Sequence, residues 1–329
     1  MRSIKNALVT GATGFIGQRL LAKLAEEECN VRALILKGDP NEASARRMNA
    51  EIVWGSVDDP RAVDQAMQGV DTVFHLAAAV GDWLEEDVVR KVTLDGTRTV
   101  LKAAAAQGAR AVLASSIVVY GDAIPLEECP EEHAFGKALG RYSASKQEQE
   151  RIGDELALSA NLALTKLRLA NVYGPKSRPW VEMVLEQLRA GAPVLIGHGE
   201  QNAGLLYVDN AASAFVLAAK SEAAQAQAYN ISDGSGITWK RYFSDLAKAG
   251  GCRAPRSLPA LFARPLAHAC EGAWSLLRLK GRPPVTREAL NLVGSEHRIP
   301  IEKAKRELGY EARVDYEHGL AEVQKSLRP

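Results

Sequence analysis

The chain has 329 residues, of which 47% are hydrophobic, with 41 basic and 40 acidic side chains. This length is enough for one large domain, or for one domain and a smaller second lobe. The near-zero net charge argues against nucleic acid or an anionic membrane as the main partner. The first residues lead directly into a predicted strand and no apolar run reaches membrane-spanning length, so we expect a cytoplasmic protein. The four cysteines and six histidines lack ligand spacing, and no metal site is predicted.

The first predicted strand, residues 4–10, runs into Gly11, Gly14 and Gly17 and then into a helical pattern over residues 18–25. Gly11 would allow a tight turn, Gly14 the close approach of a phosphate, and Gly17 the packing of helix on strand. Backbone N–H groups at the start of the helix would then face a pyrophosphate. Glycine spacing alone also fits an ordinary strand-to-helix loop, so this dinucleotide site needs support from other residues.

Apolar runs predict six further strands, and alanine-rich helical patterns such as 97–106 and 210–220 lie between them. The strands are expected at residues 31–36, 51–54, 72–76, 110–115, 162–170 and 227–231. Because the runs are apolar nearly throughout, helices should cover both faces of the sheet. We therefore predict an α/β fold with a Rossmann-type doubly wound parallel sheet. Residues 1–174 plus about 204–231 are assigned to this dinucleotide-binding domain, and about 175–203 plus 232–329 to a smaller C-terminal α/β substrate lobe.

A second group of residues predicts the chemistry. Tyr142 and Lys146 are four residues apart and share one helix face, and Ser115 and Ser116 end the fifth predicted strand. An ammonium beside a phenol, together with an oxidised nicotinamide, favours the phenolate and lowers the pKa of the phenol. Tyr142 would then exchange protons with a substrate oxygen to which the Ser116 hydroxyl also hydrogen-bonds. Tyrosine and lysine at this spacing alone also fit a solvated helix face. His75, at a strand end, is expected to be a packed, hydrogen-bonded residue.

Five sequence blocks together resemble the extended short-chain dehydrogenase/reductase family over almost the whole chain: residues 10–17, 71–78 (DTVFHLAA), 115–121 (SSIVVYG), 142–146 and 168–175 (RLANVYGP). The resemblance implies that Ser116, four residues before Tyr120, is catalytic and that Lys146 also holds the nicotinamide ribose. It further implies cofactor contacts at Thr13, Phe15, Ile16, Leu76, Ala77, Leu169 and Val172. Ser56 stands where the family often has an adenine-binding Asp, so the adenine would be held mainly by the backbone near Val57.

Departures from the family pattern narrow the reaction. Sugar dehydratases place Asp-Glu after the catalytic hydroxyl residue, where this chain has Ile117 and Val118. Neither side chain can move a proton, which disfavours elimination. Sugar-nucleotide epimerases usually have an Arg for the diphosphate where this chain has Ala203, and the loss of that charge-assisted contact disfavours a nucleotide sugar.

Apolar residues stand where the family lines its substrate cleft. Trp83 and Leu84 follow the fourth strand, Trp180 opens the second lobe, and residues 257–280 are rich in leucine. Individually they also fit core and interlobe packing. Collectively they are most similar to the 3β-hydroxysteroid dehydrogenase and dihydroflavonol reductase branch. We predict an enzyme that interconverts a secondary alcohol and a ketone on a bulky apolar (sterol-, flavonoid- or long-chain-like) substrate. An epimerase-like isomerase and a non-catalytic NAD(P)-binding sensor or scaffold are the alternatives.

The end of the second predicted strand bears on cofactor choice. Ile35 occupies the position where an NAD enzyme usually has an acid for the ribose 2′-hydroxyl, and Asp39 comes after Gly38, too late. Lys37 would meet a 2′-phosphate, so NADP(H) is favoured over NAD(H). The family resemblance also implies a homodimer. A membrane-adjacent surface is a further alternative for the basic residues near the apolar C-terminal stretch, which are Arg278, Lys280, Arg282 and Arg287.

Overall fold

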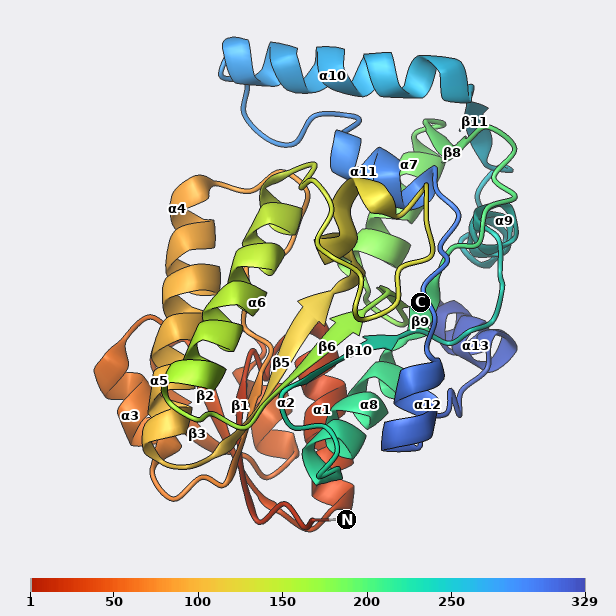
Figure 1. Ribbon diagram of the computed structural model, residues 1–329. Helices are drawn as coiled ribbons and strands as arrows, with labels where there is room; N and C mark the ends of the chain where they lie inside the picture. Colours follow the sequence, from red (N-terminus) through yellow and green to blue (C-terminus); the bar gives the residue numbers. More distant parts are fainter. Residues whose placement is uncertain (1, 329) are drawn as a thin grey trace.

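Seven parallel strands form the central sheet of the computed structural model, which describes residues 2–328 (Figure 1). Their order across the sheet is β3-β2-β1-β4-β5-β6-β10, and every neighbouring pair is parallel. The order reverses between β1 and β4, which is the switch point where doubly wound sheets bind ligands. The predicted Rossmann-type fold is therefore confirmed. The strand bounds are β1 (Asn6–Thr10), β2 (Asn30–Ile35), β3 (Glu51–Trp54), β4 (Thr72–His75), β5 (Arg110–Ser116), β6 (Leu164–Leu169) and β10 (Gln227–Ile231).

Helices cover both faces of this sheet, and each face has its own hydrophobic core. One core joins the sheet to α1 (Phe15–Glu26), α2 (Glu42–Arg47) and α8 (Val208–Lys220). The other joins it to α3 (Pro60–Met67), α5 (Gly96–Ala106) and α6 (Arg141–Ser159). Successive strand residues point to opposite faces, so Val9 lies in the first core and Leu8 in the second. This double burial explains why the strands are apolar nearly throughout.

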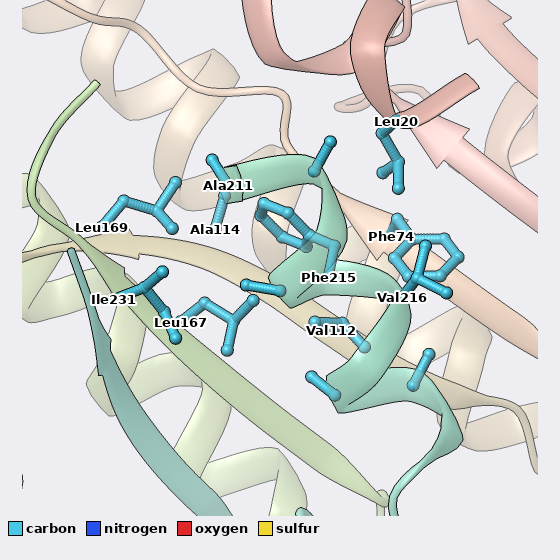
Figure 2. Close-up of a cluster of buried hydrophobic side chains, with 14 of the residues drawn as sticks. Leu20, Phe74, Val112, Ala114, Leu167, Leu169, Ala211, Phe215, Val216 and Ile231 are labelled. Atoms are coloured by element: carbon cyan, nitrogen blue, oxygen red, sulfur yellow. The ribbon is translucent and has the colours of Figure 1, made fainter. Parts of the chain in front are cut away.

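Figure 2 shows the first core, in which Phe215 of α8 lies between strand residues. The Phe74 and Phe215 rings meet edge to face with centroids 6.4 Å apart. Leu20 of α1 and Leu167 of β6 are buried in the same cluster. Such aromatic and aliphatic contacts fix α1 and α8 on the sheet. Because the glycine turn leads directly into α1, they also fix the position of that turn.

A smaller lobe is built mainly from the chain after β6, around a third, aromatic core. Tyr173 packs edge to face on Tyr207 and Tyr242, and Trp239 lies beside Phe243. Two strand pairs support it: β7 (Asn171–Tyr173) with β9 (Leu205–Tyr207), and β8 (Pro193–Ile196) with β11 (Arg256–Leu258). Its helices are α7 (Met183–Arg189), α9 (Trp239–Ala249), α10 (Ala260–Leu276), α11 (Arg287–Val293) and α13 (Tyr316–Ser326).

The helix α12 (Glu302–Leu308) returns from this lobe to the sheet. Ala304, Leu308 and Tyr310 are buried in the same core as α1 and α8. The sequence assigned all of residues 232–329 to the substrate lobe, whereas this segment packs on the sheet domain. The exact domain boundaries stay a prediction.

The remaining short helical segments frame the carboxyl edge of the sheet. They are α4 (Glu86–Val88), a π-helical turn (Val89–Asp95), a 3-10 segment (Ile117–Ala123) and a second π-helical turn (Arg178–Glu182). The 3-10 segment directly follows Ser116 at the end of β5. It therefore continues the strand that carries one of the predicted catalytic residues.

The helix α10 lies across the top of the molecule in Figure 1, away from the sheet. Of its residues only Ala263 and Ala267 are buried, whereas Leu261 and Phe262 are exposed. No helix among residues 2–328 has the length and hydropathy of a membrane span.

The four basic residues near α10 do not form one exposed surface. Arg282 donates to both carboxylate oxygens of Asp82, at 2.6 and 2.5 Å, and Arg287 pairs with Glu271. Only Arg278 and Lys280 of the four have no ion-pair partner within the described residues. The alternative of a membrane-adjacent surface therefore has half of its basic side chains paired with carboxylates of the protein itself.

The glycine turn gives a stability prediction. A Cβ on Gly17 would lie 2.1 Å from the backbone oxygen of Gly11, so Gly17→Ala must displace the turn, at a cost of roughly 1–3 kcal/mol. As the matched control, Gly272 in the exposed part of α10 has no atom within 4 Å of the place a Cβ would take, and Gly272→Ala should stabilise by about 0.5–1 kcal/mol. Thermal unfolding measures both. A Gly17→Ala protein as stable as wild type would contradict the packing described.

Candidate active site

The glycine turn between β1 and α1 has the geometry of a phosphate cradle. Gly11 has a φ of +68°, and a Cβ there would lie 2.9 Å from the backbone nitrogen of Ala77. Gly14 is the N-cap of α1, and in the described part of the chain no side chain caps that helix. The first N–H groups of α1 therefore remain available for an anion. An uncapped helix start beside a turn that only glycine permits fits the pyrophosphate of a dinucleotide.

The other residues expected to contact the cofactor follow strand ends at the same edge of the sheet. Leu76 and Ala77 come directly after β4, Leu169 ends β6 and Val172 is in β7. Thr13 precedes α1, whose first turn contains Phe15 and Ile16. Their placement agrees with the rule that parallel sheets bind ligands at their carboxyl edge. The individual contacts stay predictions.

The adenine end of the expected site lies after β3. The Ser56 hydroxyl donates a hydrogen bond to the Asp58 carboxylate, so an acid is present close to the position where the family has one. Val57 is buried and packs against Gly96, where a Cβ would lie 2.5 Å from its Cγ2 atom. The side chain of Val57 therefore packs inside the domain. This agrees with the expectation that the adenine contacts the backbone at Val57 and not its side chain.

Asp39 lies closer to the glycine turn than the sequence suggested. Gly38, with a φ of +81°, turns the chain after β2, and the Thr13 hydroxyl donates to Asp39 Oδ2 at 2.7 Å. Lys37 is exposed, and among residues 2–328 it has no ion-pair partner. Ile35 is buried in the sheet core. One free cation and one carboxylate thus flank the expected ribose position.

The three predicted catalytic side chains come together at the end of β5. Ser116 is its last residue, and Tyr142 and Lys146 lie on the first two turns of α6. The Lys146 Nζ atom is 6.0 Å from the centroid of the Tyr142 ring. Burial and the nearby Glu288 raise the pKa of Tyr142 to about 12, and the neighbouring Ser116 hydroxyl lowers it by less. The protein alone therefore keeps Tyr142 as a phenol. From the sequence, a lowered pKa was expected for Tyr142, but only when an oxidised nicotinamide is bound beside it.

Lys146 is held by two partners inside the domain. Its ammonium donates to the backbone oxygen of Ala114 at 2.8 Å and to Gln149 Oε1 at 2.7 Å. Burial lowers the pKa of Lys146 to about 8, because the charged form loses hydration there. The bond to Ala114 fixes α6 against β5.

A buried hydrogen-bond chain continues from Gln149 to the strands next to the glycine turn. Gln149 Nε2 donates to Thr97 Oγ1 at 2.8 Å, Thr97 Oγ1 is 3.0 Å from His75 Nε2, and His75 Nδ1 is 2.7 Å from Thr10 Oγ1. Burial and Lys146 lower the pKa of His75 to about 3, so its imidazole is neutral. His75 is a packed, hydrogen-bonded residue, as expected from the sequence.

The structure separates the two adjacent serines. Ser115 Oγ donates to Glu150 Oε1 at 2.5 Å, and Glu150 also accepts two hydrogen bonds from Arg168 at 3.0 and 2.8 Å. Ser115 thus belongs to a buried structural network on α6 and β6. Ser116 is left beside Tyr142, which supports its selection over Ser115.

The two tryptophans expected at the substrate have different surroundings. Trp83 is 36% exposed, in the loop after β4 whose Asp82 is held by Arg282. The Trp180 ring packs on Trp239 with centroids 5.0 Å apart, so part of it belongs to the second lobe's core. Substrate contact stays a prediction for both. A surface hollow lies at the amino edge of the sheet, where Asn30 and Arg32 are found, and the catalytic side chains lie at the opposite, carboxyl edge.

Sequence reasoning missed two residues that support the site. Gln149 holds Lys146 from one helical turn away, and its position at i+3 was an available signal. Glu288 reaches the start of α6 from α11, where its Oε1 atom accepts a hydrogen bond from the Ser143 amide at 2.7 Å. These two residues are 145 positions apart, and nothing in the local sequence indicates that they meet.

Comparison with known proteins identifies the family. The model of the NAD dependent epimerase/dehydratase family matches residues 7–232. The chain belongs to this family. Its resemblance to extended short-chain dehydrogenases/reductases is confirmed, and the protein is an NAD(P)-dependent oxidoreductase of that type.

Individual known proteins match nearly the whole chain. The 2-alkyl-3-oxoalkanoate reductase of Stenotrophomonas maltophilia (strain K279a) is 32% identical over 97% of this chain and 98% of its own. The 4-hydroxy-2-methyl-3-oxo-4-farnesyl-3,4-dihydroquinoline-1-oxide ketoreductase of Stigmatella aurantiaca is 28% identical, over 95% and 93%. The UDP-glucose 4-epimerase of Thermotoga maritima, solved with UDP-glucose, has a TM-score of 0.78 at 25% identity and covers 98% of both chains.

The two serines give a matched pair of variants. If Ser116 has its predicted catalytic role, Ser116→Ala should reduce kcat by about 10²–10³-fold, because the hydroxyl is the predicted donor to the reacting oxygen, with little change in Tm. Ser115→Ala should instead lower stability by about 1–3 kcal/mol, because Glu150 loses a buried donor, and should retain most activity. Turnover and thermal unfolding of both proteins test the assignment. The reverse pattern would transfer the catalytic role to Ser115.

Proposed function

We propose that this enzyme reduces a ketone on a bulky apolar molecule to a secondary alcohol, with NADP(H) preferred over NAD(H). The observation that carries the proposal is that Tyr142, kept as a neutral phenol by burial, comes together with Ser116 and Lys146 at the strand edge that also holds the glycine turn. A neutral phenol is a proton donor, which is what ketone reduction requires. Two relatives that match nearly full length carry the names of a reductase and a ketoreductase.

Each catalytic side chain has a distinct task in this reaction. The nicotinamide of the bound cofactor supplies the hydride. Ser116 donates a hydrogen bond to the ketone oxygen and stabilises the negative charge that develops there. Tyr142 transfers its hydroxyl proton to that oxygen. Lys146, with its ammonium fixed by Ala114 and Gln149, stabilises the tyrosinate that is left.

The surroundings of the site favour an apolar substrate without a diphosphate. Ala203 is fully buried where sugar-nucleotide epimerases usually have an Arg. Ile117 and Val118 are buried directly after Ser116, so no acid or base for elimination stands there. The alkyl and farnesyl groups in the names of the two relatives agree with an apolar substrate. An epimerase remains the second candidate, because the structure is also similar to a UDP-glucose 4-epimerase.

Consumption of reduced cofactor tests the reaction class. We expect NADPH oxidation with members of a panel of 2-alkyl-3-oxo acids and sterol, flavonoid and long-chain ketones, and at least about 10²-fold less with Tyr142→Phe, which lacks the proton donor. Cofactor binding, followed by nicotinamide fluorescence, should be retained in that variant. Near-normal turnover by Tyr142→Phe would reject the proton donor. Cofactor binding with no consumption on any ketone would favour an epimerase or a sensor.

Charge variants at the ribose position test cofactor choice. The ratio of kcat/KM for NADPH over NADH should exceed one in the wild type, fall in Lys37→Ala and rise in Asp39→Asn, because a 2′-phosphate is attracted by the first charge and repelled by the second. Asp39 is bonded to Thr13 of the glycine turn and Lys37 is exposed two residues earlier in the chain, so the two variants remove opposite charges from one short segment and each is the control for the other. A wild-type preference for NADH of more than about tenfold would overturn the NADP(H) proposal.

A further inference from the structure

Helix α11 of the C-terminal lobe covers both catalytic segments. Asn291 Nδ2 donates to the backbone oxygen of Gly121, in the 3-10 segment that follows Ser116, at 2.8 Å. Glu288, one turn earlier, bonds to the start of the tyrosine helix α6. Helix α11 therefore contacts both the segment that follows Ser116 and the helix that carries Tyr142.

Glu288 replaces the N-cap side chain that α6 lacks. The N-cap residue is Gly140, and the Ser143 amide, which an isolated helix would leave unpaired, donates to Glu288 Oε1 at 2.7 Å. A Cβ on Gly140 would lie 2.1 Å from Glu288 Oε2, so a side chain at this position would displace the carboxylate. The Glu288 carboxylate thus fills the space at the helix start that a side chain at position 140 would need.

The Glu288 carboxyl is buried with little to neutralise it. It is 3% exposed, Oε2 has no hydrogen-bond partner within the described residues, and no cation lies within ion-pair distance there. Burial raises the pKa of Glu288 to about 7, against the effect of the Ser143 hydrogen bonds, and Asp82 raises it further. Glu288 in turn raises the pKa of Tyr142.

The other titratable groups on the elements around α11 have partners of their own. Asp82 accepts hydrogen bonds from Arg282 and Thr286, Arg287 pairs with Glu271, and Asp122 accepts from the Lys137 amide. On α6, Lys146 is bound to Ala114 and Gln149, and Tyr120 of the 3-10 segment donates to Asn230. The Lys146 ammonium, 6.0 Å from the centroid of the Tyr142 ring, favours the phenolate of Tyr142, whereas the Glu288 carboxylate, bonded to the next amide of the chain, opposes it.

We propose that Glu288 is a positioning residue that holds the first turn of α6 through the Ser143 amide, and that its ionised carboxylate there disfavours a second negative charge on the adjacent Tyr142, so that the site favours ketone reduction over alcohol oxidation. This inference rests on the proposed reductase function. Reduction needs the phenol of Tyr142 and oxidation needs the phenolate. A carboxylate at the start of the helix disfavours a second negative charge beside it, which moves phenolate formation to higher pH.

Glu288→Gln tests the charge separately from the structure. Glutamine retains an oxygen for the Ser143 amide and removes the charge. The alkaline limb of the kcat profile for ketone reduction and the acid limb for alcohol oxidation should both move to lower pH. If the pKa of Tyr142 falls by one, the phenolate fraction, and with it oxidation below the limb, increases about tenfold. A purely structural role would lower both activities without moving either limb.

Two readouts need no substrate and therefore remain decisive if the reductase function is wrong. The absorbance change on tyrosinate formation, with the Tyr142→Phe background subtracted, should show a lower pKa for Tyr142 in Glu288→Gln. Amide exchange in the first turn of α6 should accelerate in Glu288→Ala and much less in Glu288→Gln. Glu311→Gln removes one exposed charge of the same lobe and should change neither.

The outcomes separate the two parts of the inference. An unchanged pKa of Tyr142 and unmoved pH limbs in Glu288→Gln would overturn the electrostatic part. Unchanged amide exchange in Glu288→Ala would overturn the positioning part. A lower pKa of Tyr142 and faster exchange in a protein that reduces no ketone would retain the role of Glu288 and reject only the proposed direction of catalysis.

Discussion

The position of the catalytic side chains depends on the burial of one ammonium group. Lys146 is almost fully inside the protein, where a charge without polar partners would cost several kcal/mol. The Ala114 carbonyl and the Gln149 amide supply those partners, and the first of them belongs to β5. The same bond that satisfies the charge therefore docks α6 on the strand that ends in Ser116. Tyr142, one turn before Lys146, is placed beside Ser116 as a consequence.

This interaction also connects the catalytic and cofactor sides of the site. The chain of hydrogen bonds from Lys146 continues through Thr97 and His75 to Thr10, whose hydroxyl accepts from the Ala77 amide at 3.3 Å. Thr10 directly precedes the glycine turn. A buried polar network of this kind specifies one arrangement, because every unpaired member would be costly. The C-terminal lobe completes the site from the other side through α11.

Much of this architecture could be predicted because its signals are local. Continuous apolar runs gave each strand of the sheet to within about two residues, as the doubly buried environment requires. The three glycines of the first turn are close together in the sequence, and Tyr142 and Lys146 are one helical turn apart, so both features can be recognised from short stretches of sequence. The rest depends on tertiary folding. Asp39 was set aside because it comes after Gly38, but the turn at Gly38 brings its carboxylate to the Thr13 hydroxyl of the glycine turn. Glu288 and the return of α12 to the sheet are contacts over long sequence separations, which no local pattern records.

In the proposed reaction, hydride passes from a reduced nicotinamide to a ketone carbon while Tyr142 supplies the proton. Cofactor deuterated at C4, prepared separately on each face of the nicotinamide ring, tests it directly by mass spectrometry of the product. The expected product is an alcohol that carries one deuterium on the new carbinol carbon, from one face only, formed at least about 10²-fold more slowly by Tyr142→Phe. A product without deuterium, formed while the labelled cofactor is returned unchanged, would contradict ketone reduction.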